Sequence, residues 1–445
     1  MPSDLLWLLL LVLALLCLLS PWLQRPVVTA RAPRLLKPRT PDDCPACGQQ
    51  AVCPTPDPPP SPPVRPWRDV KSRRGAPKRI DTHGFACPNR ACVYYRIVDA
   101  QVHALVGDGR EGKIERIQTL RCQACRTTFT TRRDTPLYRL KTASQRVGEV
   151  LSALAEGLDI SAAGRVFGHR HATIATWVTR AGEHSATLHD RWLQDLQLPH
   201  LQLDELRTRV RRRTRALWLW LVVDPCTKLI PVLYVGARTQ EAAHTVIHTL
   251  YQKLTPGCLP VFTSDGLNLY FYALTAHFGQ WVTPAGRRTC QWQVATGLIY
   301  GQIKKRYCRR RLVGVTYVMH CGTRAALREA LIGLGLSGRL NTAFVERVNL
   351  TVRQSVAALL RRTWSTMQEA PQLRVHLEWW RAYYHFVRPH ASLRVALAHP
   401  IDHRGKRQPQ RYRQCTPAMA ARLTHRPWTV RELLALPLLP APAAA

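Results

Sequence analysis

Three acidic residues stand in a strongly basic stretch of the chain and together could hold divalent cations. Between positions 200 and 360 there are seven acids, whereas arginine and lysine are abundant. Asp204 lies inside a predicted strand, Asp265 follows another, and Glu346 lies on a predicted helix. Carboxylates brought close together repel one another unless cations lie between them. Three that hold two Mg²⁺ (or Mn²⁺) ions about 4 Å apart would form an apparatus for in-line attack on a phosphodiester.

The other acids of this stretch have more ordinary interpretations. Side chains alternate along a strand, so Glu205 should point to the opposite face from Asp204, and Asp204 is the favoured ligand. Asp224 lies in a predicted turn and is interpreted as structural, whereas Glu241 and Glu329 are interpreted as exposed helix acids. The chain has 17 histidines, but they form no comparable constellation with serine.

The third acid lies on a helix predicted over 343–362. Its buried stripe is predicted to consist of Val345, Val348, Val352, Val356 and Leu359. Glu346, Asn349 and Arg353 recur at helical spacing along a polar stripe beside it. If this helix lies across the sheet, Glu346 reaches the metal ions, and Asn349 and Arg353 are predicted to face phosphate.

The strands that carry the first two acids belong to an α/β pattern. We predict strands over 200–204, 216–223, 229–235 and 259–263, with a helix over 240–254 before the last. Three strands, a helix and a fourth strand beside the first is the order of an RNase H-like core, a mixed sheet flanked by helices. This order would bring Asp204 and Asp265 together. Pro231 cannot donate a ladder hydrogen bond, so the third strand should lie at an edge.

Upstream, closely spaced cysteines indicate a structural metal site. Cys87 and Cys92 are followed, after 29 residues, by Cys122 and Cys125. Four thiolates on two tight turns bind tetrahedral Zn²⁺, as in a zinc ribbon, and the ion then replaces a core too small to stabilise itself. Disulfides are the alternative, although a protein that binds a polyanion belongs in a reducing compartment. Between the pairs, strands are predicted over 94–106 and 114–120.

Residues 144–182 are predicted to be helical. A helix over 160–167, a break over 168–170 and a helix over 172–181 match a helix-turn-helix, whose second helix enters the major groove of DNA. Apolar residues at 174, 177 and 178 should pack inward. The residues predicted to face DNA are His171, Thr173, Thr176 and Arg180. An ordinary helical hairpin is the alternative.

Basic clusters flank the predicted acidic site. Six arginines lie within 207–215, directly after the first acid, and a second cluster lies within 304–311. We interpret both as phosphate clamps, which bind any DNA sequence, and a solvated basic loop is the alternative. The residues predicted to contact DNA here are Arg207, Arg211, Arg212, Arg213, Lys304, Lys305 and Arg310.

The motifs around the acids resemble those of a known family. LDE at 203–205, TSDG at 263–266 and FVERVNLTVR at 344–353 resemble the three acidic motifs of DDE transposases, closest to the insertion-sequence-one-like group. The ERVNLTVR stretch is the most specific of these. The zinc ribbon and helix-turn-helix also fit that group, so the resemblance covers about residues 85–365. Residues 385–393 resemble a segment found after the last acid in many integrase-core transposases.

The resemblance implies a DNA transposase that uses two metal ions to cut at the ends of its own element and to join them to target DNA. It implies double-stranded DNA as the partner and a homo-oligomer that holds two ends together. The stretch between Asp265 and Glu346 is longer than expected and indicates a basic insertion at about 280–335. Two other hypotheses stay open: a DNA-binding regulator without catalysis, and an RNase H-like nuclease without strand transfer.

Composition agrees with a polyanionic partner. The 445 residues include 64 Lys and Arg against 28 Asp and Glu, a net charge of +36, and 46% are hydrophobic. The apolar content excludes a mainly disordered chain, and the charge excludes an ordinary metabolic enzyme. Nucleic acid is the favoured partner, and a cytoplasmic, nucleoid-associated protein is expected. On composition alone, a basic ribosome-associated or membrane-surface protein stays open.

The N-terminal region has its own features. Residues 5–23 are almost wholly apolar, borderline in length for a bilayer, and basic residues follow them. A membrane anchor with the bulk of the chain on the cytoplasmic side and an apolar leader are equal alternatives. Cys44 and Cys47 form a pair that could bind zinc with Cys53 or His83, or have no such role. Eight prolines within 54–66 predict a stiff linker.

These observations predict a multidomain chain of mixed α+β and α/β class. The predicted parts are an apolar segment at 1–24, a basic and proline-rich linker at 25–79, a zinc ribbon at 80–140, a helix-turn-helix domain at 141–197, an RNase H-like catalytic domain at 198–395 and a basic, proline- and alanine-rich tail at 396–445.

Overall fold

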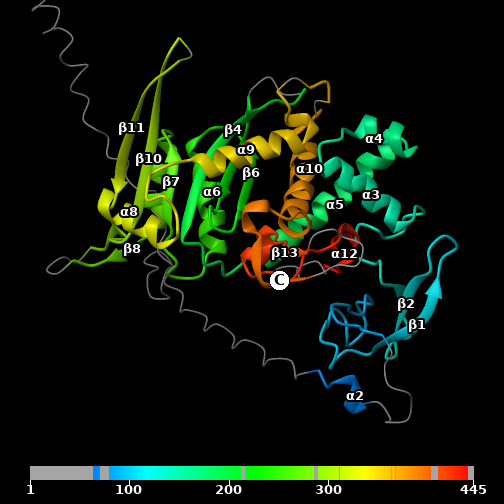
Figure 1. Ribbon diagram of the computed structural model, residues 1–445. Helices are drawn as coiled ribbons and strands as arrows, with labels where there is room; N and C mark the ends of the chain where they lie inside the picture. The colour runs from blue at the N-terminus through cyan, green and yellow to red at the C-terminus, as the bar shows by residue number, and fades with distance from the viewer. Residues whose placement is uncertain are drawn as a thin grey trace, which may run out of the picture. The chain divides into compact units, whose positions relative to one another are not determined.

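The computed structural model describes residues 64–70, 80–211, 216–284, 289–309, 311–361, 363–365, 367–401 and 409–438, which all fall within the unit Val64–Ala445 (Figure 1). Several predictions concern residues outside these ranges. They are the apolar segment 5–23, the linker except 64–70, the pair Cys44 and Cys47, and the basic residues Arg212, Arg213 and Arg310.

A mixed sheet runs through the larger part of the described chain, with the strand order β11-β10-β7-β4-β5-β6 (Figure 1). Its strands are β4 (His200–Thr208), β5 (Leu217–Val223), β6 (Val232–Gly236), β7 (Val261–Asp265), β10 (Ile299–Cys308) and β11 (Arg311–Cys321). β4, β5 and β6 are antiparallel, β7 is parallel to β4, β10 is parallel to β7, and β11 is antiparallel to β10. This order is compatible with an RNase H-like core, and it confirms that the fourth predicted strand lies beside the first.

The two apolar strands occupy the positions that their sequences predict. β5 lies between β4 and β6, and six of its seven residues are buried, because both faces of the sheet are covered there. β6 is the edge strand, and Pro231, which lacks an N–H, lies directly before it.

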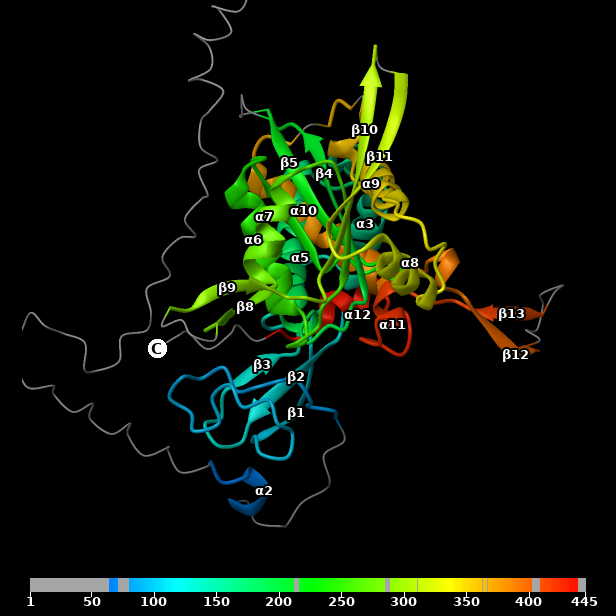
Figure 2. The same ribbon diagram turned by 90° about the vertical axis from the view of Figure 1, so that its left-hand side faces the viewer.

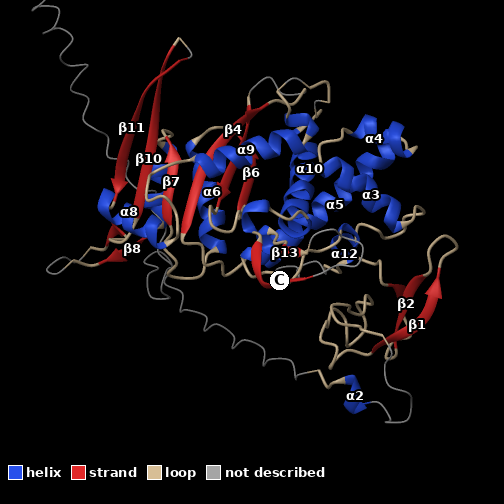
Figure 3. Ribbon diagram, viewed as in Figure 1, coloured by secondary structure: helices blue, strands red, loops and turns tan. Residues whose placement is uncertain are grey.

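Helices cover both faces of this sheet (Figure 3). They are α6 (Gln240–Lys253), α7 (Leu269–His277), α9 (Ala343–Ser355) and α10 (Ala370–Ala382). Since side chains alternate along β5, Leu219 and Leu221 pack with α9 and α10, whereas Trp220 and Val222 pack with α6 and α7. The buried stripe predicted for the 343–362 helix is confirmed, but α9 is shorter. It ends at Ser355, and a 3₁₀ turn, Ala357–Leu359, keeps the last apolar side chains in the core.

Three helices precede the sheet in the chain: α3 (Ser144–Ala155), α4 (Ile160–Phe167) and α5 (His171–Trp192). The carboxylate of Asp159 accepts a hydrogen bond from the N–H of Ala162 and caps α4, and Gly168 ends α4 in a left-handed conformation at φ 71°. The two predicted helices and the glycine turn are thus present. α5 is longer than the predicted 172–181, because its second half packs along α10.

Close contact between α5 and α10 depends on a glycine. A Cβ at Gly182 would lie 2.0 Å from the carbonyl oxygen of Val375, so a larger residue there would push the helices apart. These helices share a core with α3 and with α12 (Val430–Ala435), which comes from the C-terminal part of the chain.

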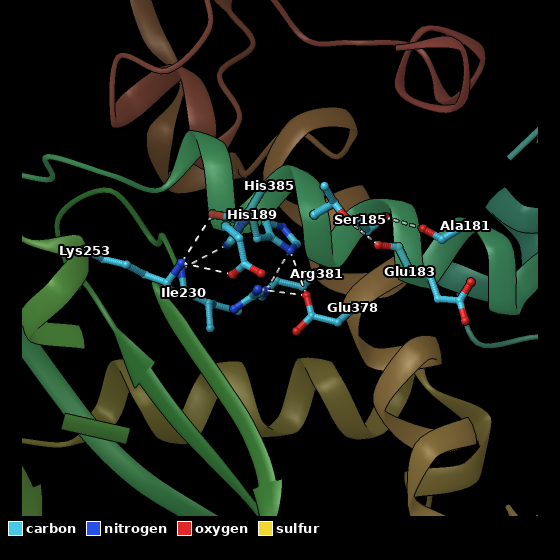
Figure 4. A network of polar contacts seen from close by, with 11 residues as sticks. Ala181, Glu183, Ser185, His189, Ile230, Lys253, Glu378, Arg381 and His385 are labelled. Atoms are coloured by element: carbon cyan, nitrogen blue, oxygen red, sulfur yellow. Dashed lines mark hydrogen bonds and ion pairs between the residues drawn. The ribbon is translucent and has the colours of Figure 1, made fainter. Parts of the chain in front are cut away.

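A buried polar network joins α5 and α10 to the sheet (Figure 4). The carboxylate of Glu378 pairs with Arg381 at 2.8 Å and lies 2.8 Å from Nδ1 of His189. The N–H of Ile230, in the turn before β6, donates to Nε2 of His385 at 3.0 Å. Burial lowers the pKa of His385 well below its usual value, which keeps that nitrogen an acceptor. Removing one charged partner here would be costly, since the other would stay buried.

The cysteine-containing segment forms a small sheet with the order β1-β2-β3 (Figure 2). Its elements are α2 (Trp67–Val70), β1 (Leu105–Glu111), β2 (Ile117–Cys122) and β3 (Thr128–Thr130). The strand predicted over 94–106 is wrong for most of its length, because turns and irregular chain precede β1, which begins only at Leu105. Glu115, after β1, accepts hydrogen bonds from the N–H (2.8 Å) and hydroxyl (2.7 Å) of Ser144 and so caps α3.

The region predicted as an insertion at about 280–335 is only partly one. It contains β8 (Gly279–Val282) in part, β9 (Gln291–Val294) and α8 (Arg324–Gly333), but also β10, which pairs with β7 in the main sheet. That pairing stops at Ile303, so the rest of β10 pairs with β11 alone as a hairpin. The C-terminal part adds β12 (Val395–Ile401), β13 (Gln410–Arg413) and α11 (Pro417–Ala420). None of the helices in the described ranges is both long and apolar enough to cross a bilayer.

Candidate metal centres

Carboxylates of β4 and β7 meet where these two strands lie side by side. The strands are parallel, and Leu203 pairs with Ser264, so Asp204 and Asp265 come next on each. One carboxylate oxygen from each of Asp204, Glu205 and Asp265 lies within 4.8 Å of the other two. Opposite ligands of an octahedral Mg²⁺ ion are about 4.2 Å apart, so oxygens within 4.8 Å of one another lie close enough to share an ion. The expected proximity of Asp204 and Asp265 is confirmed.

Glu205 belongs to this carboxylate cluster as well, although it points to the opposite face of β4 from Asp204, as predicted. Because side chains alternate along β4, Asp204 and Glu205 have hydrogen-bond partners on opposite faces of the sheet. Nδ2 of Asn349, on α9, donates to Oδ2 of Asp204 at 2.6 Å, whereas Glu205 accepts from Nε of Arg238 (2.9 Å) and from the hydroxyl of Tyr270 (3.3 Å). The carboxylates can still meet, because β7 ends at Asp265 while β4 continues.

Burial raises the pKa of all three acids, and the charges of neighbouring carboxylates add to the effect. Burial, followed by the charges of Asp265 and Glu205, raises the pKa of Asp204 to about 7. Burial and the charge of Asp265 raise the pKa of Glu205 to about 7 as well, although Arg238 acts in the opposite direction. Burial also raises the pKa of Asp265. A divalent cation among these groups would remove the repulsion that disfavours their ionised forms.

Glu346, the third predicted ligand, does not join the three clustered oxygens. Its Oε1 pairs with Nζ of Lys305 on β10 and accepts from the hydroxyl of Thr342 at 2.9 Å. Its side chain is 48% exposed. Glu346 is nevertheless close enough that its charge contributes to the raised pKa of Asp204 and of Asp265. α9 therefore brings this acid beside the cluster, where Lys305 neutralises it.

The donor set fits a hard divalent cation such as Mg²⁺ or Mn²⁺. Three carboxylates lie together and a fourth is adjacent, and oxygen ligands are those that such ions prefer. Asn349 gives an independent sign. Its Oδ1 is buried and has no hydrogen-bond partner within the described residues, while its Nδ2 holds Asp204. An ion's bound water or a substrate hydroxyl would supply the missing donor.

The four predicted cysteine ligands also come together. Sγ of Cys87 lies 3.5 Å from Sγ of Cys125, Sγ of Cys92 lies 3.8 Å from Sγ of Cys122, and all four sulfurs lie within 4.8 Å of one another. Four sulfurs at 2.3 Å from a tetrahedral Zn²⁺ would be about 3.8 Å apart. None of the described cysteines forms a disulfide, so the alternative pairing is not present here.

Thiol electrostatics at this cysteine cluster also fit a bound cation. Burial raises the pKa of Cys87 and of Cys92, and neighbouring thiols add to the effect. Burial acts in the same direction on Cys125, but hydrogen bonds with Thr127 outweigh it and lower the pKa of Cys125 to about 6. The surrounding core is small, with Tyr94, Leu105, Leu120 and Phe129 as its larger apolar members. A structural Zn²⁺ would therefore supply stability that apolar burial does not.

The residues predicted to read DNA lie on the outer side of α5. His171, Thr176 and Arg180 are exposed and Thr173 is half-buried, whereas the apolar residues at 174, 177 and 178 are buried as predicted. Arg180 donates to the carbonyl oxygen of Tyr138 at 3.0 Å. The side chains thus face outward, and nothing in their contacts tests what they bind.

The predicted phosphate clamps fall into two groups. Arg207, after the acids on β4, and Arg353, after Glu346 on α9, line one cavity of about 500 Å³. Lys304 and Lys305 lie on β10, where Lys304 is exposed and Lys305 pairs with Glu346. Arg211 is exposed, and its Nη2 lies 3.5 Å from the carbonyl oxygen of Trp364.

Sequence reasoning missed the residues that hold the cluster in place. Arg238 lies in the connection between β6 and α6, and Tyr270 lies on α7. Both are far from Glu205 in the sequence, so no motif spacing links them to it. For Glu205 a signal existed, because two adjacent acids stand in a stretch that is poor in acids. The chain matches no model of a known protein family and no curated protein sequence.

Proposed function

We propose that this protein is a DNA transposase of the bacterial insertion-sequence type, which cuts phosphodiesters at the ends of its element and joins them to target DNA. The convergence of Asp204, Glu205 and Asp265 on one point of an RNase H-like sheet carries the proposal. Its support is chemical: buried, mutually repelling carboxylates beside a strongly basic surface suit divalent ions and a phosphate substrate.

In this proposal the chain's own residues hold the acids in position. Asn349 fixes Asp204 from α9, and Arg238 and Tyr270 fix Glu205 from the other face of the sheet. Bound Mg²⁺ or Mn²⁺ would activate a water or 3′-hydroxyl for attack and stabilise the leaving oxygen. Glu346 would add a further carboxylate once Lys305 turns to phosphate, as its position on β10 beside the acids allows.

DNA binding is assigned to the remaining predicted elements. The four-cysteine module would be a zinc ribbon, and α4 and α5 would form a helix-turn-helix in which His171, Thr173, Thr176 and Arg180 reach base edges. Arg207, Arg211, Lys304 and Arg353 would contact phosphates without regard to sequence. Holding two element ends requires more than one subunit, so we propose a homo-oligomer that works on nucleoid DNA. Free cysteines suit such a reducing compartment.

The decisive experiment uses a supercoiled plasmid that carries the gene with its native flanking DNA. With Mg²⁺ or Mn²⁺, the wild-type protein should nick this plasmid at fixed positions and join the ends to a second plasmid, and chelation should abolish both steps. Asp265→Asn, which keeps the shape of the side chain, should cut and join at least about 10³-fold more slowly.

The outcomes separate three functions. Metal-dependent cutting with no joined product would indicate an RNase H-like nuclease. Binding to the flanking DNA with no cutting by the wild type would indicate a DNA-binding regulator, a possibility that the pairing of Glu346 with Lys305 favours. Cutting that Asp265→Asn leaves unchanged would reject the catalytic assignment altogether.

A further inference from the structure

Trp364 is placed where tryptophan is rarely found. Its side chain is 95% exposed, more than any other large apolar residue among those described. A tryptophan is highly buried on average, because its ring contributes a large apolar area. The residue lies in the segment that follows α9 and its 3₁₀ turn. An indole held in solvent on a folded surface indicates a partner with a flat apolar face.

The base of this segment is fixed, so the exposed ring is held out from an ordered support. The N–H of Arg211 donates to the carbonyl oxygen of Met367 at 2.9 Å, and Nη2 of Arg211 lies 3.5 Å from the carbonyl oxygen of Trp364. On the other side, Ala357 and Leu359 are buried in the core beneath the sheet.

Two hollows flank the segment, and both have basic walls. One, of about 480 Å³, is lined by Trp364 together with Arg165, His171 and Arg211, and by one acid, Asp159. The other, of about 500 Å³, is lined by Arg207, Arg209, Arg353 and Arg361. Ala358 lines both, so the hollows adjoin. The surface that they form, here called the Trp364 groove, leads from the start of α5 to the end of β4.

The second hollow has no acid in its lining among the described residues, whereas Asp159 lines the first hollow, where its carboxylate caps α4. No carboxylate of the described residues forms an ion pair with Arg207, Arg209, Arg353 or Arg361. Burial and the charge of Arg361 lower the pKa of Arg353, which shows that the guanidinium groups are crowded. Four arginines without acids around one hollow are complementary to a chain of phosphates.

The groove begins near the carboxylate cluster. Arg207 is three residues beyond Asp204 on β4, about 10 Å at the rise of a strand. Arg353 is seven residues beyond Glu346 on α9, again about 10 Å. A DNA strand advances about 3.4 Å per nucleotide in a duplex, so the arginines lie roughly three nucleotides from the acids.

An exposed ring beside several arginines suits an unpaired DNA strand better than a duplex. In a duplex the faces of the bases are covered by their neighbours, and an indole has nothing on which to stack. We propose that Trp364 stacks on an unpaired base of the DNA strand whose phosphates lie along Arg207, Arg209, Arg353 and Arg361. The substrate at this groove is thus a melted or frayed strand close to the cut position. This inference rests on the proposed DNA-cutting function.

The test measures binding in the presence of chelator, with the full chain, a labelled 20-nucleotide oligothymidine and a duplex of the same length. Trp364→Ala should weaken binding of the single strand about 10-fold and change duplex affinity less than about 2-fold, since stacking on one base contributes that much. Trp364→Phe should retain most of the single-strand affinity. Wild-type tryptophan fluorescence should be quenched by the single strand, and Trp364→Ala should lose most of the quenching.

Trp281→Ala is the matched control, because Trp281 is also exposed but lies on β8, away from the groove lining. It should leave both affinities unchanged. Arg207→Ala combined with Arg353→Ala should weaken the binding of both the single strand and the duplex. The affinity of this double variant should also depend less on salt concentration. Melting temperatures should not fall in Trp364→Ala, because the ring is not packed.

If Trp364→Ala reduced the affinity for single strand and duplex equally, or reduced neither, the inference would be overturned. A concentration-dependent dimer in the wild type that Trp364→Ala abolishes, with unchanged DNA affinity, would assign the ring to a second copy and overturn it as well. Because cutting needs the acids and this test does not, Asp265→Asn should bind the oligothymidine normally. Failure of cutting with the Trp364 effect intact would reject the proposed function alone.

Discussion

The cysteine cluster and the carboxylate cluster both gather groups that repel one another when ionised, but they are built differently. The four cysteines come from two short stretches on tight turns around a small core. The three carboxylates come from two neighbouring strands of a large sheet, and residues of α7, α9 and the connection between β6 and α6 hold them. The first cluster has little other structure to stabilise it. The second is surrounded by cores that stand without it.

This difference separates stability from chemistry. Where apolar burial is small, a metal ion has to contribute to folding itself, and its loss should unfold the module. Where the fold is already stable, it can hold acids close together although they repel one another. A cation that binds between them relieves this repulsion, and the relief favours binding. The four predictions that follow test this contrast, from the largest expected effect to the smallest.

Replacing a ligand of the cysteine cluster should unfold residues 80–140. Cys122→Ala removes one of four thiolates, and structural Zn²⁺ contributes on the order of 10 kcal/mol to such modules. Zinc content should fall from about one ion per chain to none, and the amides of Leu105 and Leu120 should lose protection from hydrogen exchange. Cys290→Ala, at an exposed cysteine outside the cluster, is the control and should change neither. Retained zinc and protection in Cys122→Ala would contradict the structural role.

Replacing an acid of the carboxylate cluster should have the opposite consequence. Asp204→Asn should reduce metal-dependent DNA cutting by about 10³-fold or more without lowering the melting temperature in chelator. The stability should hold or rise, because the change removes a repelling charge while Asn349 keeps an oxygen to bond. Scanning calorimetry and a cutting assay measure the two effects. A large loss of stability would mean that the acids support the fold, and the contrast with the cysteines would disappear.

Stability without metal should depend on pH through the acids. The pKa of Asp204 and of Glu205 is raised to about 7, so the folded state keeps protons that the unfolded chain releases above about pH 4. Their contribution is fully present below the unfolded pKa and is lost as the pH rises through about 7. Relative to Asp204→Asn, the wild type should lose about 2 kcal/mol of unfolding free energy between about pH 5 and 8. Denaturant melts measure this difference, and excess Mg²⁺ should remove it.

The smallest expected effect concerns the lysine beside the cluster. Lys305 pairs with Glu346, and its charge opposes the rise that burial causes in the pKa of Asp265, so it supplies part of the positive charge that a cation would bring. Lys305→Met should lower the Mg²⁺ concentration for half-saturation about 3-fold, measured by calorimetric titration without DNA. Lys304→Met, at the neighbouring exposed position, should leave it unchanged. Weaker Mg²⁺ binding in Lys305→Met would show that the lysine organises the acids and does not compete with the ion.

Local patterns predicted part of this architecture well. The convergence of the four cysteines follows from their spacing, because short turns fix how the thiols approach one another. The apolar run of β5, the proline before β6 and the stripe of α9 each predicted a place in the fold, since burial selects side chains of that kind. Element ends were less certain: α9 is shorter and α5 longer than predicted, because packing against neighbours and not propensity decides where a helix stops.

Contacts between distant segments were predicted only where a motif suggested them. The approach of Asp204 and Asp265 was expected from the strand order, but the place of Glu205 was not. Alternation assigned Glu205 to the other face correctly, yet the end of β7 lets both faces reach one point. The role of β10 was also missed, because a basic, two-sided strand lacks the apolar run that marks a core strand.

The amino-acid sequence by itself determined which residues could bind metal, where several of the main strands and helices form, and that the chain is strongly cationic. These properties depend on residue type and on spacing over a few positions, which short-range geometry converts into structure. Tertiary structure alone decided that Glu205 joins the acids, that Lys305 pairs with Glu346 and that Trp364 stands exposed between arginines. Those outcomes depend on how strands end and helices cross, and many weak contacts along the whole chain set that geometry together.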